Sequence, residues 1–109
     1  MNLNKYLIKQ IAWSSKTFGN GERSQGIVDH IRKELVEIEE KPNDLEEWID
    51  VVILALDGAW REGYSPDQIA NALQHKLTKN KSRKWPDWRA AEDGKAIEHI
   101  RNEATEQSE

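Results

Sequence analysis

Hydrophobic residues recur along the chain at spacings of three and four, which places them on one side of an α-helix. The first such stretch ends at Gly19-Asn20-Gly21, so a helix is expected over about the first 17 residues. A second stretch has Ser24 as its expected N-cap and ends before Pro42, because proline cannot continue a helical hydrogen-bond ladder. Its apolar stripe consists of Ile27, Ile31, Leu35 and Ile38.

Capping signals predict where two further helices begin. The first and last residues of Asn43–Glu46 resemble a capping box, and Gly63 is a typical C-terminal stop. Ser65–Gln68 repeats the box, with a proline at the first helical position. A third helix is therefore expected to run to Gly63, and a fourth to reach about Lys84.

The third helix contains an unbroken apolar run at residues 51–56. Such a run alone also fits a buried strand, but its flanks extend it to about 20 residues, which is too long for a strand. A helix that is apolar on nearly every side must be covered all round. We therefore expect a homo-oligomer, either a dimer or a tetramer, with this helix at its centre.

The end of the chain has weaker signals. Residues 85–88 indicate a turn, residues 91–103 suggest a short fifth helix, and residues 104–109 are expected to fray. At 109 residues the chain is long enough for one domain. The sequence thus predicts an all-α bundle of four to five helices, with a single domain over residues 1–103 and completed by oligomerisation.

Composition excludes several classes of protein. The chain has no cysteine, which excludes disulfides, thiolate nucleophiles and zinc–cysteine sites, so a metal would need oxygen or imidazole ligands. No apolar run approaches the roughly 20 residues of a membrane span, and the first residues do not resemble a signal peptide. We expect a cytoplasmic protein with no membrane partner.

The net charge of −4 hides two blocks of opposite sign. Residues 34–50 contain eight acids and one base, a net −7, whereas residues 75–89 contain six bases and one acid, a net +5. The two blocks could neutralise each other, or both could face a ligand that carries cations and phosphates. The overall negative charge argues against a nucleic-acid partner.

Paired acids mark the acidic block. Glu34 and Glu37 lie three residues apart and share a helix face, as do Glu47 and Asp50. Carboxylates crowded at the edge of a buried helix face repel one another unless a cation neutralises them. Mg2+ suits such a site, with Mn2+ able to substitute. The alternative is that both pairs are ordinary solvated acids.

The basic block continues an apolar stripe. At about 100° per residue, Lys76, Asn80 and Arg83 fall on the face that begins with Ile69 and Leu73. A bound triphosphate would use all three side chains. Alternatively, they pair with the acids, or the segment up to Lys84 is a solvated tail with affinity for nucleic acid.

Together these motifs resemble a known family. The Glu-x-x-Glu and Glu-x-x-Asp pairs are the metal-binding signature of the all-α nucleoside triphosphate pyrophosphohydrolases, the superfamily of MazG, dimeric dUTPase and dCTP pyrophosphatase. The chain is most similar to the phage and prophage dATP/dGTP pyrophosphohydrolases, which include MazZ-type enzymes. The resemblance extends over about residues 10–101 and rests on WSSKTFG (13–19), HIRKEL (30–35), EWIDVVILALDGAWR (47–61) and WPDWR (85–89).

The resemblance implies a Mg2+-dependent nucleoside triphosphate pyrophosphohydrolase that releases a monophosphate and pyrophosphate, with dGTP or dATP as substrate. The catalytic and metal-binding residues would be Glu34, Glu37, Glu47 and Asp50. The β- and γ-phosphates would be bound by Lys76, Asn80 and Arg83. The pattern does not say which carboxylate accepts the proton of the attacking water. The alternative is a non-catalytic helical binding protein that contacts nucleic acid through residues 76–89.

Several single residues have two interpretations. Trp13, Phe18 and His30 are candidates for contact with the base, although a lone histidine is more often an ordinary surface or core residue. Asp57 could extend the acidic face, but an ion pair with the arginine four residues on is simpler. That arginine, Arg61, and Arg23 could reach phosphate or form surface ion pairs.

Overall fold

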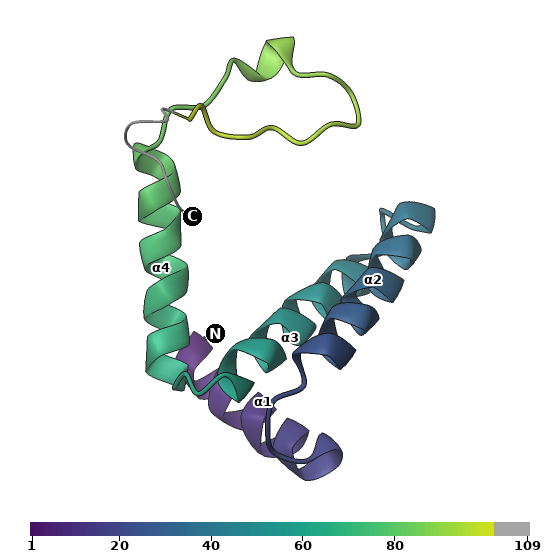
Figure 1. The fold of residues 1–109 in the computed structure, drawn as a ribbon, viewed down its shortest axis with the longest axis vertical. Helices are drawn as coiled ribbons and strands as arrows, with labels where there is room; N and C mark the ends of the chain where they lie inside the picture. The colour runs from purple at the N-terminus through teal and green to yellow at the C-terminus, as the bar shows by residue number, and fades with distance from the viewer. Residues whose placement is uncertain (102–109) are drawn as a thin grey trace. The chain divides into compact units, whose positions relative to one another are not determined.

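The computed structural model describes residues 1–101, and all regular structure in that range is helical. The chain forms α1 (Leu3–Phe18), α2 (Ser24–Glu40), α3 (Leu45–Arg61) and α4 (Pro66–Ser82), followed by one 3-10 turn at Trp88–Ala90 (Figure 1). The predicted all-α fold is confirmed, and four of the four to five predicted helices are present in the described range. None of the helices in the described range is long and apolar enough to cross a membrane.

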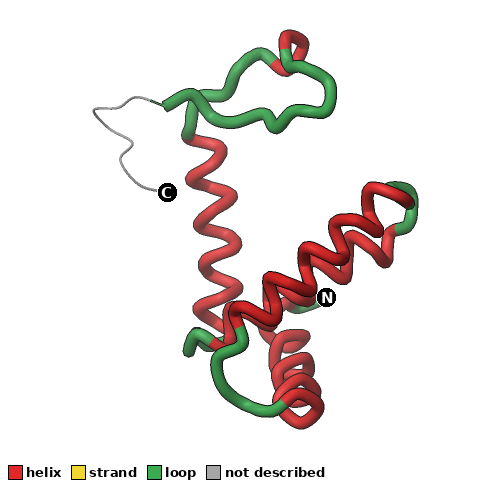
Figure 2. Tube along the Cα trace, turned by 45° about the vertical axis from the view of Figure 1, so that its right-hand side comes forward, coloured by secondary structure: helices red, strands yellow, loops and turns green. Residues whose placement is uncertain are grey.

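The chain divides into two compact units, Met1–Ala72 and Leu73–Glu109. In the first unit, α2 and α3 lie side by side as an antiparallel hairpin, and α1 packs against α3 (Figure 2). Helix α4 begins in the first unit and continues into the second. The hairpin places the two paired-acid motifs on neighbouring helices.

The start of α2 differs from the prediction. Ser24 is not the N-cap: it is the first residue of the helix, and the cap position is taken by Arg23, whose side chain makes no capping hydrogen bond. The Ser24 hydroxyl instead donates to Glu62 Oε1 over 2.8 Å. This bond connects the beginning of α2 to the end of α3. The Ser24 hydroxyl therefore makes a long-range contact and not the predicted capping bond.

Of the predicted caps of α3 and α4, the first is wrong by one residue and the second is confirmed. Helix α3 is capped by Asp44 rather than Asn43, because the Asp44 carboxylate accepts from the backbone N–H of Glu46 over 3.0 Å. The box at Ser65–Gln68 is confirmed, since each of its end residues accepts a hydrogen bond from the backbone N–H of the other, over 2.9 and 3.1 Å.

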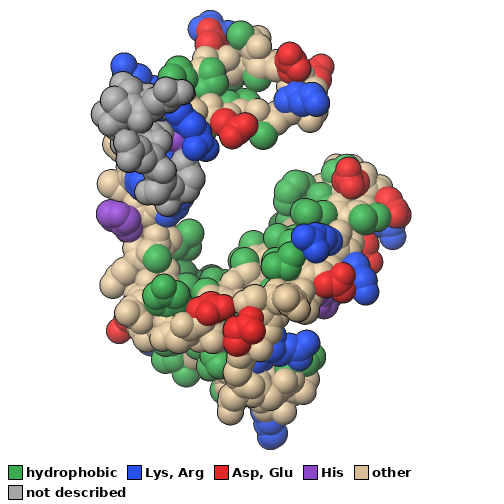
Figure 3. Space-filling view, viewed as in Figure 1, with side chains coloured by type: hydrophobic (Ala, Val, Ile, Leu, Met, Phe, Trp, Pro, Cys, Tyr) green, Lys and Arg blue, Asp and Glu red, His purple; other side chains and the backbone are tan. Residues whose placement is uncertain are grey.

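The apolar core of the described residues is small and comprises Leu7, Ile27, Ile38 and Ile69. Leu35, predicted on the same buried stripe as Ile27 and Ile38, is half exposed. Helix α3 buries only Arg61, while hydrophobic side chains follow its length at the surface of the first unit (Figure 3).

The predicted fifth helix is wrong for the residues that the structure describes. Residues 91–101 contain no helix; Gly94 turns the chain with a φ of 74°, and the backbone N–H of Ile100 donates to the carbonyl of Lys84 over 2.7 Å. His99 is buried edge-to-face against Trp85. These contacts close residues 84–100 into a loop, which a helix would not allow. Residues 102–103 and the predicted frayed tail at 104–109 lie outside the described residues.

Candidate functional site

Three carboxylates meet where α2 and α3 run side by side. Glu34 and Glu37 from α2 and Glu47 from α3 each place one carboxylate oxygen within 4.8 Å of the other two. We call these three residues the acid cluster. The spacing of three residues puts the α2 pair on one face, and the hairpin brings the third carboxylate to that face.

Two oxygens of the acid cluster are buried without a hydrogen-bond donor. Within residues 1–101 no N–H or O–H group donates to Glu34 Oε2 or Glu47 Oε2. Glu34 as a whole is only 9% exposed, and its other oxygen lies 3.2 Å from His30 Nε2. Buried carboxylate oxygens without donors are costly unless a cation compensates them.

The pKa values report the same crowding. Burial raises the pKa of Glu34, and the Glu37 and Asp50 carboxylates raise it further, against a lowering effect of His30. The Glu37 carboxyl lies close enough to Glu47 to share a proton with it; together with burial and the surrounding negative charge, this raises the pKa of Glu47 to about 7. The cluster is thus reluctant to hold three negative charges, and a divalent cation with oxygen ligands fits it.

Asp50, the fourth predicted ligand, is not one of the three convergent carboxylates. It is exposed, one turn after Glu47 on α3, and close enough for its charge to raise the pKa of Glu34. Glu46 is exposed in the first turn of α3, where Asp44 accepts from its backbone N–H. Of the two adjacent glutamates, only Glu47 therefore belongs to the cluster.

A cavity of about 210 Å³ lies between α1, α2 and α3. Its lining includes all three predicted base contacts, Trp13, Phe18 and His30, as well as Asp50. The Trp13 and Phe18 rings pack edge-to-face with centroids 5.4 Å apart. Since His30 also contacts Glu34, the cavity adjoins the acid cluster.

A buried ion pair closes the other end of α3. Arg61 Nε donates to Asp57 over 2.9 Å, and the Arg61 side chain is only 1% exposed. Its two other nitrogens donate to the carbonyls of Gly19 and Gly21 and to the Ser14 hydroxyl. The predicted pair is confirmed, but it is internal rather than at the surface, and the guanidinium is occupied by protein acceptors.

Asp57 is fully supplied with donors. Its carboxylate accepts from the Ser14 hydroxyl, from Trp60 Nε1 over 2.7 Å and from Arg61. Burial alone would raise the pKa of Asp57, but these hydrogen bonds and the positive charge hold it below its usual value. We call Ser14, Asp57, Trp60 and Arg61 the Asp57 network.

Two buried polar residues of α1 were not predicted from the sequence. Gln10 and Ser14 are both buried; Gln10 Nε2 donates to the Ile53 carbonyl over 3.0 Å. The signal was present, because these two residues follow Leu7 at spacings of three and four. They continue the buried stripe of the helix with polar side chains.

The predicted phosphate-binding residues belong to the second unit. Arg83 Nη1 donates to Asn80 Oδ1 over 3.3 Å, while Lys76 is exposed. Arg83 follows the last residue of α4, Ser82, and the Asn80 carbonyl accepts from Trp85 Nε1 over 2.7 Å. All three residues lie in the second unit and the acid cluster lies in the first, so their meeting stays a prediction.

Comparisons with known proteins agree with the resemblance. The Eaa protein of Salmonella phage P22 is 37% identical over 92 residues, which are 84% of this chain and 27% of that protein. The chain thus spans about a quarter of the length of this relative.

Among solved structures, a cyanophage S-2L MazG-like pyrophosphohydrolase, bound to dGDP and three catalytic Mn2+ ions per active site, has a TM-score of 0.69 and 28% identity. This match covers 93% of the present chain and 99% of that chain. Residues 7–106 match the dATP/dGTP pyrophosphohydrolases. Because this match takes in nearly all of the sequence, the chain belongs to the dATP/dGTP pyrophosphohydrolase family.

Proposed function

We propose that this protein hydrolyses a purine deoxynucleoside triphosphate, dGTP or dATP, to the monophosphate and pyrophosphate with Mg2+ or Mn2+ as cofactor. The observation that carries the proposal is the acid cluster, in which three carboxylates converge and two buried oxygens have no donor among residues 1–101. When all three carboxylates are ionised, this arrangement is stable only if a cation is bound to them. Family membership supplies the reaction class.

Glu34, Glu37 and Glu47 would hold the divalent ions, and Asp50 would complete the ligands from the edge of the cavity. When bound, the ions supply positive charge at the phosphates and make the attacking water more acidic. His30, 3.2 Å from Glu34, holds that carboxylate in place from the side of the cavity. The three Mn2+ ions of the cyanophage enzyme support a site of this charge.

The cavity beside the acid cluster would take the purine base. Trp13 and Phe18 provide flat apolar surface, and His30 lies between the cavity and the carboxylates. Aromatic side chains contribute much of the contact area at such sites. The dGDP bound by the cyanophage enzyme supports a purine substrate.

Lys76, Asn80 and Arg83 would bind the β- and γ-phosphates. Lysine and arginine offset phosphate charge, and the asparagine amide donates a neutral hydrogen bond. In the reaction, water attacks the α-phosphorus and the bond to the β-phosphate oxygen breaks. Pyrophosphate leaves, and these cations stabilise the charge that grows on it.

We also propose that the active form is a homo-oligomer, a dimer or a tetramer. Within the first unit, Met1–Ala72, the apolar face of α3 is only partly covered: Trp48 and Val52 are each 50% exposed. A contiguous apolar surface on a helix is typical of a face that another subunit covers. Sedimentation of the purified protein tests this, since a monomer at micromolar concentration would contradict it.

The test of the reaction compares two adjacent glutamates. Purified protein is incubated with each of the eight common nucleoside triphosphates and Mg2+ or Mn2+, and pyrophosphate release is measured. We expect release from dGTP or dATP that is lost in Glu47→Gln and retained in Glu46→Gln, because only Glu47 belongs to the acid cluster.

Loss in both variants would instead indicate a general charge effect along α3. No release from any substrate by folded wild-type protein would contradict the enzyme assignment of this chain. In that case, DNA affinity that falls steeply with salt would support nucleic-acid binding through residues 76–89.

A further inference from the structure

Arg23 occupies a position that local physics disfavours. It is the N-cap of α2, where serine, threonine, aspartate or asparagine is normal, yet its side chain makes no capping hydrogen bond, and the Glu22 carboxylate accepts from the Ser24 N–H instead. Its positive charge also lies at the positive end of the helix dipole. Ser24, a good capping residue, is next in sequence and is used elsewhere. A residue that breaks local rules often serves a ligand.

Arg23 also lines the cavity, where four other polar side chains already have partners and Asp50 is proposed above as a metal ligand. Gln10 donates to the Ile53 carbonyl and accepts from Tyr6 over 2.6 Å, and Ser14 and Asp57 are bonded within the Asp57 network. His30 contacts Glu34. No acceptor among the described residues bonds the Arg23 guanidinium, so its donors are available to a ligand.

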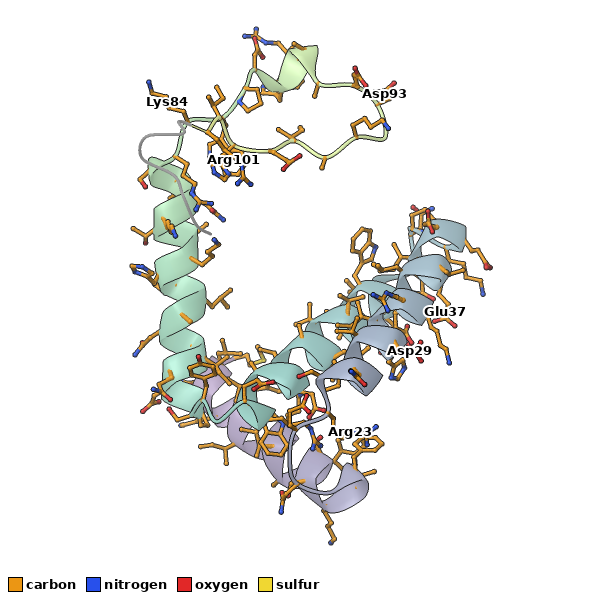
Figure 4. All side chains as sticks on the ribbon, in the orientation of Figure 1. Arg23, Asp29, Glu37, Lys84, Asp93 and Arg101 are labelled. Atoms are coloured by element: carbon orange, nitrogen blue, oxygen red, sulfur yellow. The ribbon has the colours of Figure 1, made fainter. Side chains whose placement is uncertain are left out.

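The position of Arg23 along α2 separates it from the acid cluster. Glu34 follows it by eleven residues, which at 1.5 Å per residue is about 16 Å along the helix axis. Figure 4 labels Arg23 at the start of α2 and Glu37 far along the same helix. A nucleotide with its phosphates at the acid cluster therefore meets Arg23 with its base.

The absence of a side chain at Gly26 leaves room for the Arg23 guanidinium. A β-carbon at Gly26 would lie 3.3 Å from Arg23 Nη2, closer than ordinary van der Waals contact. The arginine head group therefore rests directly over the backbone of the first turn of α2. Even the smallest side chain at this position would displace it by a few tenths of an ångström.

We propose that Arg23 determines the base preference of the site by donating two hydrogen bonds to O6 and N7 of guanine, so that dGTP is preferred over dATP. Arginine has donors only, and guanine presents two acceptors on this edge, whereas adenine presents N7 beside an amino group that is itself a donor. The inference rests on the proposed function for the placement of the base in the cavity.

The experiment measures binding and turnover separately. Calorimetry compares dGMP and dAMP on wild-type protein and on Arg23→Gln, because glutamine pairs with the adenine edge where arginine pairs with guanine. We expect wild type to bind dGMP about tenfold to a hundredfold more tightly than dAMP and Arg23→Gln to lose or invert this ratio. The kcat/KM values for dGTP and dATP should change in the same way.

Base analogues and control variants sharpen the test. dITP keeps O6 and N7 and should behave as dGTP does, whereas 7-deaza-dGTP lacks N7 and should lose part of the advantage. Arg32→Gln changes an exposed arginine of α2 outside the cavity and should leave the ratio unchanged. Gly26→Ala should lower the ratio by a smaller factor while the helix keeps its stability.

Two results would overturn the proposal: equal losses for all bases in Arg23→Gln, which would place the guanidinium on phosphate, or wild-type protein that does not distinguish dGMP from dAMP. Absence of pyrophosphate release from every triphosphate would instead overturn the proposed reaction. The calorimetric ratio would still decide the role of Arg23 in that case.

Discussion

Helix α3 carries two part-buried carboxylates, ten residues apart, in opposite electrostatic surroundings. Glu47 lies in the acid cluster beside two other carboxylates, none of the described residues donates to its buried oxygen, and its pKa is raised to about 7. Asp57 accepts three side-chain hydrogen bonds, one of them from Arg61, and its pKa is lowered despite burial.

The difference lies in the supply of donors and positive charge. At the Asp57 end, the fold itself brings Ser14 and Arg61 to the carboxylate, so the charges compensate each other and bind α1 and the 19–21 turn to α3. At the Glu47 end, the described residues supply only His30, at 3.2 Å from Glu34. A buried negative site that the described residues of the first unit do not compensate is suited to a cation from solution.

The largest expected effect is on activity at the Glu47 end. Glu47→Gln should lower the rate of pyrophosphate release by about a thousandfold or more, because it removes a metal ligand where ion binding contributes several kcal/mol to catalysis. In metal-free buffer the same variant should melt at a higher temperature than wild type, since one of three repelling carboxylates is gone. Glu46→Gln should match wild type in both measurements.

The opposite response is expected at the Asp57 end. Arg61→Met should lower the free energy of unfolding by about 3 kcal/mol, because it leaves Asp57 buried without its positive partner. Urea denaturation measures this change. Asp57→Asn combined with Arg61→Met should be less destabilised than Arg61→Met alone, since no lone charge remains buried. If Arg61→Met lowered the free energy of unfolding by less than about 0.5 kcal/mol, Arg61 would behave as an exposed arginine. That result would contradict the contrast between the two ends of α3.

The two carboxylates should also respond to pH with opposite signs. Glu47 has a raised pKa, so its favourable contribution to metal-free stability is present below its ordinary value of 4.5 and is lost as pH rises through about 7. Asp57 has a lowered pKa, so its contribution is present above its ordinary value of 3.8 and is lost as pH falls below it. Thermal melting in a chelator between pH 3 and pH 8 measures both.

Metal binding at the Glu47 end should become stronger as pH rises, whereas the metal-free stability falls. A proton must leave Glu47 before an ion binds, so the affinity for Mn2+ should fall by about tenfold from pH 8 to pH 6. Calorimetric titration with Mn2+ at the two pH values measures the ratio. A pH-independent affinity would mean that the acid cluster is not the binding site.

Much of the helical architecture was predictable because it depends on local signals. The three- and four-residue spacings, the proline at position 42 and the box at Ser65–Gln68 all act within one helical turn or one cap. The convergence of Glu34, Glu37 and Glu47 needed one further step, the antiparallel pairing of α2 with α3. That pairing follows from the short loop between them.

The features that sequence analysis missed depend on contacts between distant residues. Arg61 is buried because the carbonyls of the turn at Gly19 and Gly21 face it, some 40 residues earlier in the chain. The Ser24 hydroxyl likewise donates to Glu62, 38 residues later in the chain, and does not cap α2. The expected helix after residue 91 is replaced by a loop because Ile100 bonds back to Lys84. None of these partners can be read from local spacing.

The smallest effect concerns the donors that distinguish Asp57 from Glu47. Ser14→Ala removes one hydrogen bond to Asp57 and one acceptor from Arg61, and should cost about 1–2 kcal/mol of unfolding free energy. It should also raise the pKa of Asp57, so that the loss of stability on acidification begins at a higher pH. Ser15→Ala, at the adjacent position, lacks these bonds and should leave both quantities near wild type. If the two variants behave alike, Arg61 alone accounts for the low pKa of Asp57, and one buried cation is enough to separate the structural end of α3 from its acidic end.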